Sequence, residues 1–355
     1  MTTGPRISVV VATYDRPDTL RVAVHSALLQ TRPPLEVVVV GDACAAETGD
    51  TLARIEGPIR YLNLPGRCGE QAIPNSVGAA LAEGGLVAFL NHDDVWLPDH
   101  LETAFRALAR TGRRWHVGAA AFSPPLTEAM RDSGITFPDR TVEGRSIASA
   151  FTRANRYLEP VSSWVVERRL LERVGYWRPA RRLYRTPTQD LALRLWRRAG
   201  EPSFDDRITV LKLGKAPRRS QQGGERAAYR LPVPGLEDLE RRVAEIPAMG
   251  DGPLRSTLLA GPAWSRDREP HVTIDPIGAG RAASAAARRL VGPRAARLYR
   301  GTGIDLLTVV YGLAGTRRGQ MLERMLRRRT GEQLPMRAEL GDMIAWARSR
   351  SPSGE

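Results

Sequence analysis

Lysine, cysteine and long apolar runs are scarce in this 355-residue chain. Its only lysines are Lys212 and Lys215, and its two cysteines, Cys44 and Cys68, supply neither a disulfide framework nor a set of metal ligands. The tract from Leu306 to Ala314 is too short for a membrane span, which needs about 20 apolar residues. The N-terminus lacks the charged and apolar regions of a signal peptide. These absences predict a cytoplasmic protein.

Arginine supplies almost all of the positive charge, and the net charge is +14. Between Arg281 and Arg329 twelve arginines face only two acids, Asp305 and Glu323, a local excess of +10. No basic surface interleaved with aromatic residues is evident, so we expect no nucleic-acid partner. Basic helices with apolar faces bind anionic membranes, which predicts peripheral attachment at the inner face of the plasma membrane. The alternative is a solvated helical face or a contact between subunits.

The first part of the chain alternates apolar runs with helical patterns. The apolar runs are nearly continuous, as in strands buried on both faces of a parallel sheet. The sequence therefore predicts an α/β fold with helices on both faces of a mostly parallel sheet. The expected strands are residues 6–13, 35–42, 59–64, 86–91 and 115–122, and the expected helices are residues 18–29, 45–55, 75–82 and 98–110.

Polar residues follow the first four of these strands. The fourth strand runs into "NHDD", which places two adjacent carboxylates, Asp93 and Asp94, directly after a core strand. Adjacent carboxylates repel each other unless a cation or hydrogen-bond donors compensate. Ligands bind beyond the carboxyl ends of strands in such sheets, so four polar ends predict a pocket. The alternative is a polar turn before a helix that Asp94 or Asp99 caps.

The turn after the first strand, "ATYDRPD", contains no glycine, which excludes a Rossmann dinucleotide loop, and the chain has no Walker loop. Paired acids can hold a nucleoside diphosphate through a divalent cation instead. The segments "SVVVATYDRPDTLRVAVHSALLQ", "EVVVVGDACAAET", "LPGRCGEQAIPNSVGAALAEGGLVAFLNHDDVWLPDHL" and "TPTQDLALRLWRRAG" resemble, in this order, the family 2 glycosyltransferases. The resemblance covers about residues 5–213 and implies a GT-A fold, which is Rossmann-like.

The resemblance also implies roles for residues at the strand ends. Thr13, Tyr14 and Asp15 would lie beside the base and ribose of a nucleotide-diphospho-sugar, and Asp42 would accept the imide N–H of the base. Arg67 would meet the diphosphate. A turn-forming role for Asp42 and a solvated position for Arg67 remain open alternatives.

Asp93 and Asp94 match the acids that bind the ribose and a divalent cation, Mn²⁺ or Mg²⁺, with Asp94 as the main metal ligand. Asn91 stands where the family often has a third acid, so metal affinity should be weaker, although the amide can still bind a ribose hydroxyl. We expect His92 to be a turn residue or a residue that supports the ligands, and not a ligand itself.

Asp190 matches the general base of the family, which acts by single displacement and inverts the anomeric carbon. It stands in the first turn of a helix that Thr186 or Thr188 would cap, so it could instead only stabilise the helix start. The chain lacks the Q-x-x-R-W signature of processive synthases. The resemblance thus implies a non-processive transferase of polysaccharide biosynthesis, acting on a glycan, lipid-linked or small-molecule acceptor.

Three regions are expected: a glycosyltransferase domain over residues 1–213, a loop or linker over 214–252, and an arginine-rich, mostly helical region over 253–355. Two other functions remain open. A degenerate transferase would bind nucleotide sugars without turnover. A sugar nucleotidyltransferase shares the architecture but usually has a glycine-rich loop after the first strand, which "ATYDRPD" is not.

Overall fold

The computed structural model describes residues 4–125, 135, 139–140, 147, 160–180, 183, 186–214, 236–249, 281–305, 309 and 339–350. Within these residues nine strands form one sheet, in the order β3-β2-β1-β4-β8-β6-β9-β5 with β7 beside β6. The strands are β1 Ile7–Thr13, β2 Glu36–Gly41, β3 Ile59–Asn63, β4 Leu86–Asn91, β5 Asp94–Trp96, β6 Trp115–Pro125, β7 Asp139–Arg140, β8 Trp164–Glu167 and β9 Ser203–Gly214.

Six of the nine strands run in the same direction. The strands β3, β2, β1 and β4 are consecutive parallel neighbours, β8 is antiparallel to β4 and to β6, and β9 is parallel to β6. Only β5, β7 and β8 point the other way among these strands. The predicted α/β fold with a mostly parallel sheet is confirmed, and the antiparallel members make it a mixed sheet.

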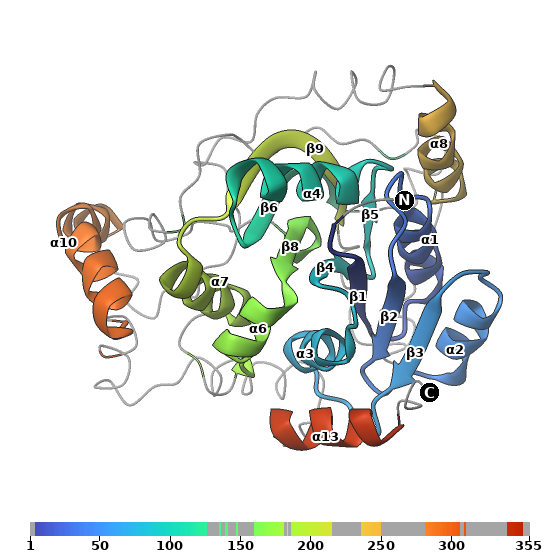
Figure 1. Cartoon of the computed structure of the whole chain (residues 1–355), viewed down its shortest axis with the longest axis horizontal. Helices are drawn as coiled ribbons and strands as arrows, with labels where there is room; N and C mark the ends of the chain where they lie inside the picture. Colours follow the sequence, from blue (N-terminus) through green and yellow to red (C-terminus); the bar gives the residue numbers. More distant parts are fainter. Residues whose placement is uncertain are drawn as a thin grey trace.

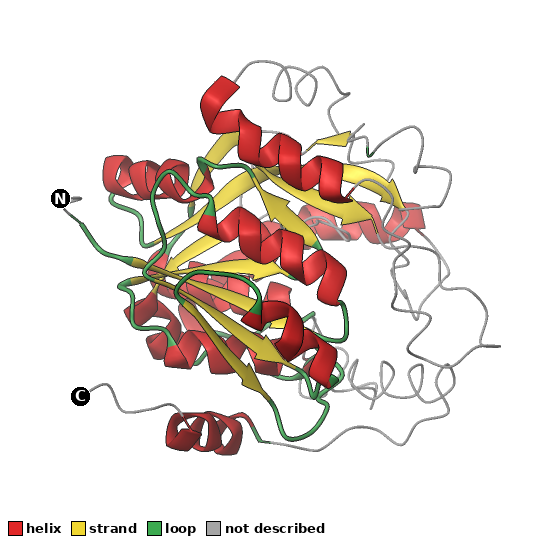
Figure 2. Cartoon of the chain, turned by 90° about the vertical axis from the view of Figure 1, so that its right-hand side faces the viewer, coloured by secondary structure: helices red, strands yellow, loops and turns green. Residues whose placement is uncertain are grey.

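Helices cover both faces of the sheet (Figures 1 and 2). They are α1 Pro17–Leu28, α2 Ala46–Ala53, α3 Ala72–Leu81, α4 His100–Thr111, the 3-10 turn η2 Val161–Ser163, α6 Arg168–Val174, α7 Pro187–Ala199, α8 Leu236–Met249, α10 Arg281–Thr302 and α13 Leu340–Arg350. No described helix has both the length and the apolar composition that crossing a membrane requires.

The central strands are buried on both sides because their side chains alternate between two cores. Val9 and Val11 of β1 lie in one core with Leu20 of α1 and Leu101 of α4. Val10 lies in the opposite core with residues of α3, α6 and α7. Gly78 of α3 allows close contact there, since a Cβ at this position would come within 2.4 Å of Val10.

The N-terminal elements agree with the predicted ranges to within three residues at each end, but β5 was not predicted. The expected elements left residues 92–97 unassigned, and a polar turn before a helix was the alternative interpretation of the two acids. Instead, Asp94, Val95 and Trp96 form a short buried strand that pairs antiparallel with β9. Three residues carry too short a pattern to be recognised as a strand, and the pairing partner lies far away in the sequence.

Residues 236–249, which we assigned to a loop or linker, form helix α8. Leu236, Leu239 and Val243 of this helix are buried against the sheet domain, and Glu240 accepts a hydrogen bond of 2.5 Å from Arg21 of α1. The apolar residues of α8 have helical spacing, but the charged residues and prolines of the surrounding segment led us to predict a loop. The assignment of residues 214–252 as a linker is therefore corrected for this helix.

The two described helices of the arginine-rich region also lie against the first domain. Helix α10 inserts Ala295, Ala296 and Tyr299 into the core that contains α7. Helix α13 buries Met343 and Ala347 beside α3 and β2, on the opposite side of the molecule from α8 in Figure 1. The predicted helical character of this region is confirmed for these residues.

Candidate functional site

The ends of β1, β2, β3 and β4 bring most of the predicted site residues to one edge of the sheet. The strands are parallel neighbours, and their registers align Thr13 with Gly41, Gly41 with Asn63, and Ala12 with Asn91. The N–H of Asp42 donates to the carbonyl of Thr13 over 2.9 Å, which keeps the first two strand ends together. The predicted convergence of polar strand ends is therefore present.

The residues after β1 are held by contacts with the neighbouring strand ends. The backbone N–H of Tyr14 donates to Nδ1 of His92 over 3.2 Å, and the same nitrogen lies 3.0 Å from the hydroxyl of Thr13. Asp15 has a φ of 41°, and its carboxylate accepts the N–H of Ala45 at the start of α2 over 2.7 Å. His92 thus fixes the turn, as predicted, and Asp15 ties this turn to α2.

Asp42 is buried and holds the loop that follows β3. Its Oδ1 accepts the N–H of Cys68 over 2.5 Å, and its Oδ2 accepts the N–H of Gly69 over 2.8 Å. Burial raises the pKa of this carboxyl group, while the two backbone donors and the nearby Arg67 oppose that rise. The turn-forming alternative is present here, because both oxygens already bind backbone.

Arg67 lies in the loop that Asp42 holds. Its guanidinium carbon is 4.1 Å from the centroid of the Tyr14 ring, which is a cation–π geometry. This contact joins the end of β1 to the loop after β3. A positive charge and an aromatic ring therefore stand together at the strand edge, where a base and a phosphate could both find partners.

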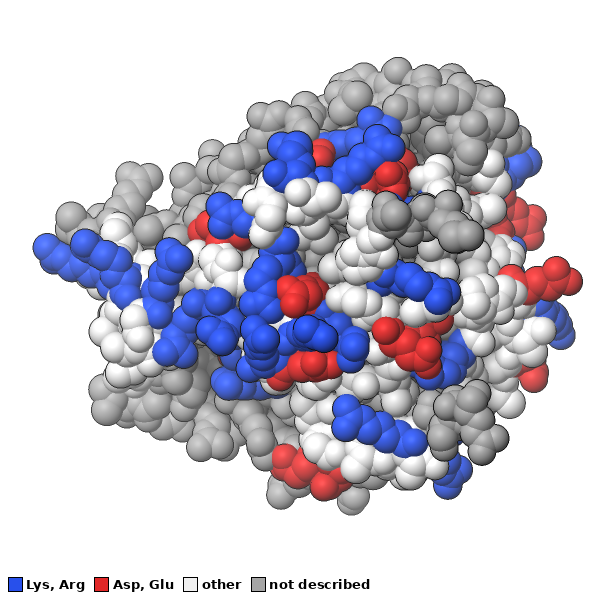
Figure 3. Space-filling view, viewed as in Figure 1, with Lys and Arg blue, Asp and Glu red and all other residues white. Residues whose placement is uncertain are grey.

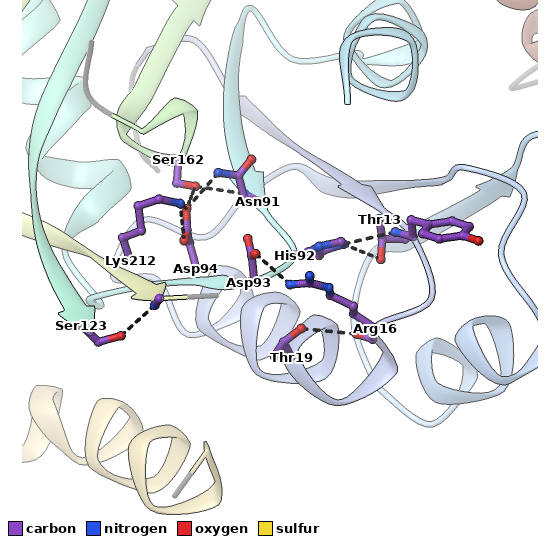
Figure 4. Close-up of polar contacts among 12 residues, drawn as sticks. Thr13, Arg16, Thr19, Asn91, His92, Asp93, Asp94, Ser123, Ser162 and Lys212 are labelled. Atoms are coloured by element: carbon purple, nitrogen blue, oxygen red, sulfur yellow. Dashed lines mark hydrogen bonds and ion pairs between the residues drawn. The ribbon is translucent and has the colours of Figure 1, made fainter. Parts of the chain in front are cut away.

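Asp93 and Asp94 point in different directions and have different partners (Figure 4). Oδ2 of Asp93 is 3.0 Å from Arg16, which follows β1. The Asp94 side chain instead lies between β5 and β9, where Lys212 is its cross-strand partner, with Nζ 3.2 Å from Oδ1 and 3.5 Å from Oδ2. Each carboxylate of the adjacent pair therefore has its own basic side chain.

Asp94 is fully buried, and two neutral side chains complete its environment. Oδ2 accepts a hydrogen bond from Asn91 Nδ2 over 2.9 Å and another from the hydroxyl of Ser162 over 2.5 Å. Burial raises the pKa of Asp94, and Lys212 together with these two donors counteracts the rise, whereas Asp93 adds to it. Asn91 thus acts as a donor to Asp94.

This donor set does not fit a divalent cation. One or two carboxylates can hold Mg²⁺ or Mn²⁺ together with phosphate and water oxygens, but their oxygens must then face the cation. Here Asp94 is bonded to two neutral donors and one ammonium, and Asp93 is bonded to a guanidinium. In the described part of the chain, no group of three His, Cys, Asp or Glu residues is placed to hold a metal. The metal expected from the resemblance stays a prediction that these contacts do not support.

Asp190 lies in the first turn of α7, which begins with a capping box between Thr186 and Gln189. One carboxylate oxygen is 2.8 Å from Nε of Arg194, and the other is 3.8 Å from Arg178. Arg194 is itself buried and donates to two backbone carbonyls over 2.5 Å each. The carboxylate of Asp190 is thereby fixed in position.

The segment before α7 connects Asp190 with the strand edge. Arg178 faces Asp190, and two residues later the N–H of Ala180 donates to the carboxylate of Glu70 over 2.9 Å. Glu70 follows directly after the loop that Asp42 holds. The described residues Arg178 and Ala180 thus link Asp190 to Glu70, the neighbour of the loop that Asp42 holds.

Three partners of the Asp93–Asp94 pair were not predicted from the sequence: Arg16, Ser162 and Lys212. Arg16 lies within the "ATYDRPD" turn, in which roles were predicted only for the residues before it. Ser162 and Lys212 come from segments far along the chain: the pairing of β5 with β9 brings Lys212 to Asp94, and η2 places Ser162 at the end of β4. The rarity of lysine in an arginine-rich chain was the one signal that could have marked Lys212.

Comparison with known proteins gives a family match for the N-terminal part of the chain. Residues 8–143 match the family model described as Glycosyl transferase family 2. This range contains all of the strand-end residues considered above except Ser162 and Lys212.

The chain is similar to the Rhizobium meliloti succinoglycan biosynthesis protein ExoO, with 38% identity over 27% of this chain and 28% of that protein. It is also similar to the Escherichia coli UDP-Glc:alpha-D-GlcNAc-diphosphoundecaprenol beta-1,3-glucosyltransferase WfaP, with 29% identity over 26% of this chain and 36% of that protein. The chain thus spans about a third of the length of these relatives. Among solved structures, S. aureus TarS 1–349 in complex with UDP-GlcNAc has a TM-score of 0.47 and 16% identity, covering 84% of this chain and 92% of that chain.

Proposed function

We propose that this chain transfers one sugar from a nucleotide-diphosphate donor to an acceptor hydroxyl, and the match of residues 8–143 to the family 2 glycosyltransferase model supports this proposal. The observation that carries the proposal is the convergence of Tyr14, Asp42, Arg67 and the Asp93–Asp94 pair at the ends of neighbouring parallel strands. Such an edge is where sheets of this type bind nucleotides.

The relatives support the donor and acceptor classes. WfaP is named for a UDP-glucose donor and a lipid-linked acceptor, a GlcNAc-diphosphoundecaprenol, and ExoO is named for polysaccharide biosynthesis. A UDP-sugar is therefore our first choice of donor, and a glycan on a lipid diphosphate is our first choice of acceptor.

The reaction we propose is a single displacement with inversion. The acceptor oxygen forms a bond with the anomeric carbon while the bond from that carbon to the diphosphate oxygen breaks, and Asp190 takes the acceptor proton. Arg194 holds the carboxylate of Asp190 in a fixed position through its contact at 2.8 Å, so that one side chain can meet the acceptor hydroxyl. The nucleoside diphosphate leaves with the bonding electrons.

We also propose that the exposed side of α10 binds the anionic membrane surface on which a lipid-linked acceptor would lie. Arg294, Arg297 and Arg300 are exposed on this helix, together with the apolar side chains of Val291 and Leu298. In Figure 3, Lys and Arg side chains gather on the left, where Figure 1 places α6, α7 and α10. Basic residues beside exposed apolar ones are typical of helices that lie in a membrane interface.

The test is a panel of UDP-glucose, UDP-GlcNAc, GDP-mannose and dTDP-glucose, each offered with and without a GlcNAc-diphospholipid acceptor. We expect release of the nucleoside diphosphate that depends on the acceptor, and a product of inverted anomeric configuration by NMR. Nucleotide binding without release would indicate a degenerate transferase. Release of pyrophosphate from a nucleoside triphosphate and a sugar 1-phosphate would indicate a nucleotidyltransferase.

A further inference from the structure

Lys212 occupies a distinctive position at the strand edge. It stands opposite Asp94 in the β5–β9 pair, and its ammonium lies 3.2 Å from one oxygen of that carboxylate. The Asp94 side chain is fully buried, whereas 22% of the Lys212 side chain is exposed. The ammonium therefore contacts the buried acid, and part of the Lys212 side chain is exposed to solvent.

The two adjacent acids at this edge are each paired with a basic side chain of the protein. Asp93 faces Arg16 at 3.0 Å, and Asp94 faces Lys212 (Figure 4). A divalent cation bound to Asp94 would have to replace the ammonium or lie beside it, where the two positive charges would repel each other. It would also compete with Asn91 and Ser162 for Oδ2.

We propose that Lys212 supplies the positive charge that a bound metal would otherwise supply, and that the diphosphate of the donor binds without a divalent cation. This inference rests on the proposed function, since it requires a nucleotide-diphosphate donor at this edge. Asp94 then orients the Lys212 ammonium toward the diphosphate, and Asn91 and Ser162 hold Asp94 in place.

Lysine suits this role for chemical reasons. Its ammonium is a compact charge with three N–H donors, so one group can bind Asp94 and a phosphate oxygen together. Arginine provides 51 of the 53 basic residues (53 − 2), yet this position carries one of the two lysines. Arg67, whose guanidinium carbon lies 4.1 Å from the centroid of the Tyr14 ring, adds positive charge at the same edge, whereas Arg16 is paired with Asp93. Together these groups offset the charge that develops on the leaving diphosphate.

Calorimetry of UDP, GDP, CDP and dTDP binding to the full chain tests the proposal, once in EDTA and once in MnCl₂. We expect one nucleotide to bind the wild type with affinities that differ by less than about twofold between the two conditions, because any charge-assisted contact with the diphosphate is made by protein groups. Binding that requires Mn²⁺ would overturn the inference and leave the proposed function intact. If no nucleotide binds in either condition, the proposed function fails and the inference fails with it.

A double variant separates a role of Lys212 in nucleotide binding from a role in folding. Lys212→Met alone leaves Asp94 buried without its cation, so the informative protein is Lys212→Met/Asp94→Asn, in which both charges are removed. In EDTA we expect its affinity for the nucleoside diphosphate to fall by about tenfold or more, as for loss of one charged hydrogen bond, with binding of the parent nucleoside unchanged.

The matched control is Arg106→Met, which removes one positive charge from the exposed face of α4 and should leave both affinities unchanged. Diphosphate binding by the double variant at the wild-type affinity would assign Lys212 a purely structural role and overturn the inference. The comparison of EDTA with Mn²⁺ uses the wild type alone, so it decides the question even if the double variant does not fold.

Discussion

The ammonium of Lys212 lies 3.2 Å from Oδ1 of Asp94 across the β5–β9 pair, although 118 residues separate the two in the chain. Removing one partner of a buried ion pair leaves an uncompensated charge and costs about 3–5 kcal/mol, more than removing both. We expect Lys212→Met to lower the free energy of unfolding by about 3 kcal/mol, and Lys212→Met/Asp94→Asn to lower it clearly less. Urea unfolding followed by circular dichroism measures both. Equal losses in the two variants would show that the pair is not coupled.

Asp42 should have two roles: it stabilises the loop after β3, and it contributes to nucleotide binding. Its two oxygens accept the N–H groups of Cys68 and Gly69, and Asn in its place would keep only one acceptor and set an NH₂ group against the other donor. We expect Asp42→Asn to lower the unfolding free energy by about 2 kcal/mol, as for an unsatisfied buried donor, and to weaken nucleotide binding. Asp50→Asn on the exposed side of α2 is the control. A stable variant that has lost only nucleotide binding would instead favour a direct contact with the base.

Two buried histidines should make the fold sensitive to acid. Burial lowers the pKa of His116 to about 4 and that of His100 well below its usual value, and each ring is bonded to a hydroxyl, of Ser203 and Thr209 respectively. Below pH about 6.5 the unfolded chain binds protons at these positions that the folded chain does not bind. The two neutral histidines therefore make their full contribution to the free energy of unfolding above that pH. This contribution is lost as the pH drops from about 6.5 toward 4.

The expected size of this effect is about 1.4 kcal/mol per pH unit for each histidine within that window. His116→Gln should remove the contribution of one histidine to this change of unfolding free energy with pH. The unfolding free energy of the variant should therefore change less between pH 6 and pH 5 than that of the wild type, and both pH values lie inside the window of about 6.5 to 4. Urea unfolding of both proteins at the two pH values gives the difference in slope. The same slope in both would mean that His116 is protonated in the folded state.

Membrane binding through α10 should depend on its exposed arginines. Each basic side chain near an anionic surface contributes about 1 kcal/mol, so replacing Arg294, Arg297 and Arg300 by Gln should weaken binding to phosphatidylserine vesicles by roughly a hundredfold at low salt. Co-sedimentation measures this, with phosphatidylcholine vesicles and high salt expected to abolish binding of the wild type.

The control for α10 is a triple Gln variant at Arg106, Arg110 and Arg113, which are exposed on and just after α4. It changes the net charge equally but leaves α10 intact. If both triple variants bind the vesicles equally well, the solvated face or subunit contact that the sequence left open is the better interpretation of the arginine-rich region.

The residue pattern was sufficient to predict those strands that are recognisable from their own run of apolar residues. The runs around Val9, Val38 and Phe89 alternate between two cores, so continuous apolar sequence identified them as doubly covered strands. The site was predictable where it lies at the ends of those strands. Lys212 and Ser162 were not, because their proximity to Asp94 arises from pairing over long separations, which no local pattern encodes. The roles assigned to Asp190 and to the nucleotide-side residues stay predictions.

Asp190 carries the last prediction, that it is the general base. Arg194 lies 2.8 Å from its carboxylate, so Asp190→Asn keeps the shape and one hydrogen bond but cannot take a proton. We expect turnover to fall by roughly a hundredfold or more, while the affinity for the nucleoside diphosphate stays within about twofold of the wild type. Product release measured at saturating donor, together with calorimetry, separates these two quantities.

A structural role for Asp190 would give a different result. If its charge only stabilises the start of α7, then Asp190→Asn should lower thermal stability by a few tenths of a kcal/mol to about 1 kcal/mol and leave turnover per folded molecule unchanged. Asp342→Asn, which removes an exposed acid from the first turn of α13, is the matched control for a charge at a helix start. Turnover that survives in Asp190→Asn at the level of this control would exclude Asp190 as the base and leave the ion pair with Arg194 as its function.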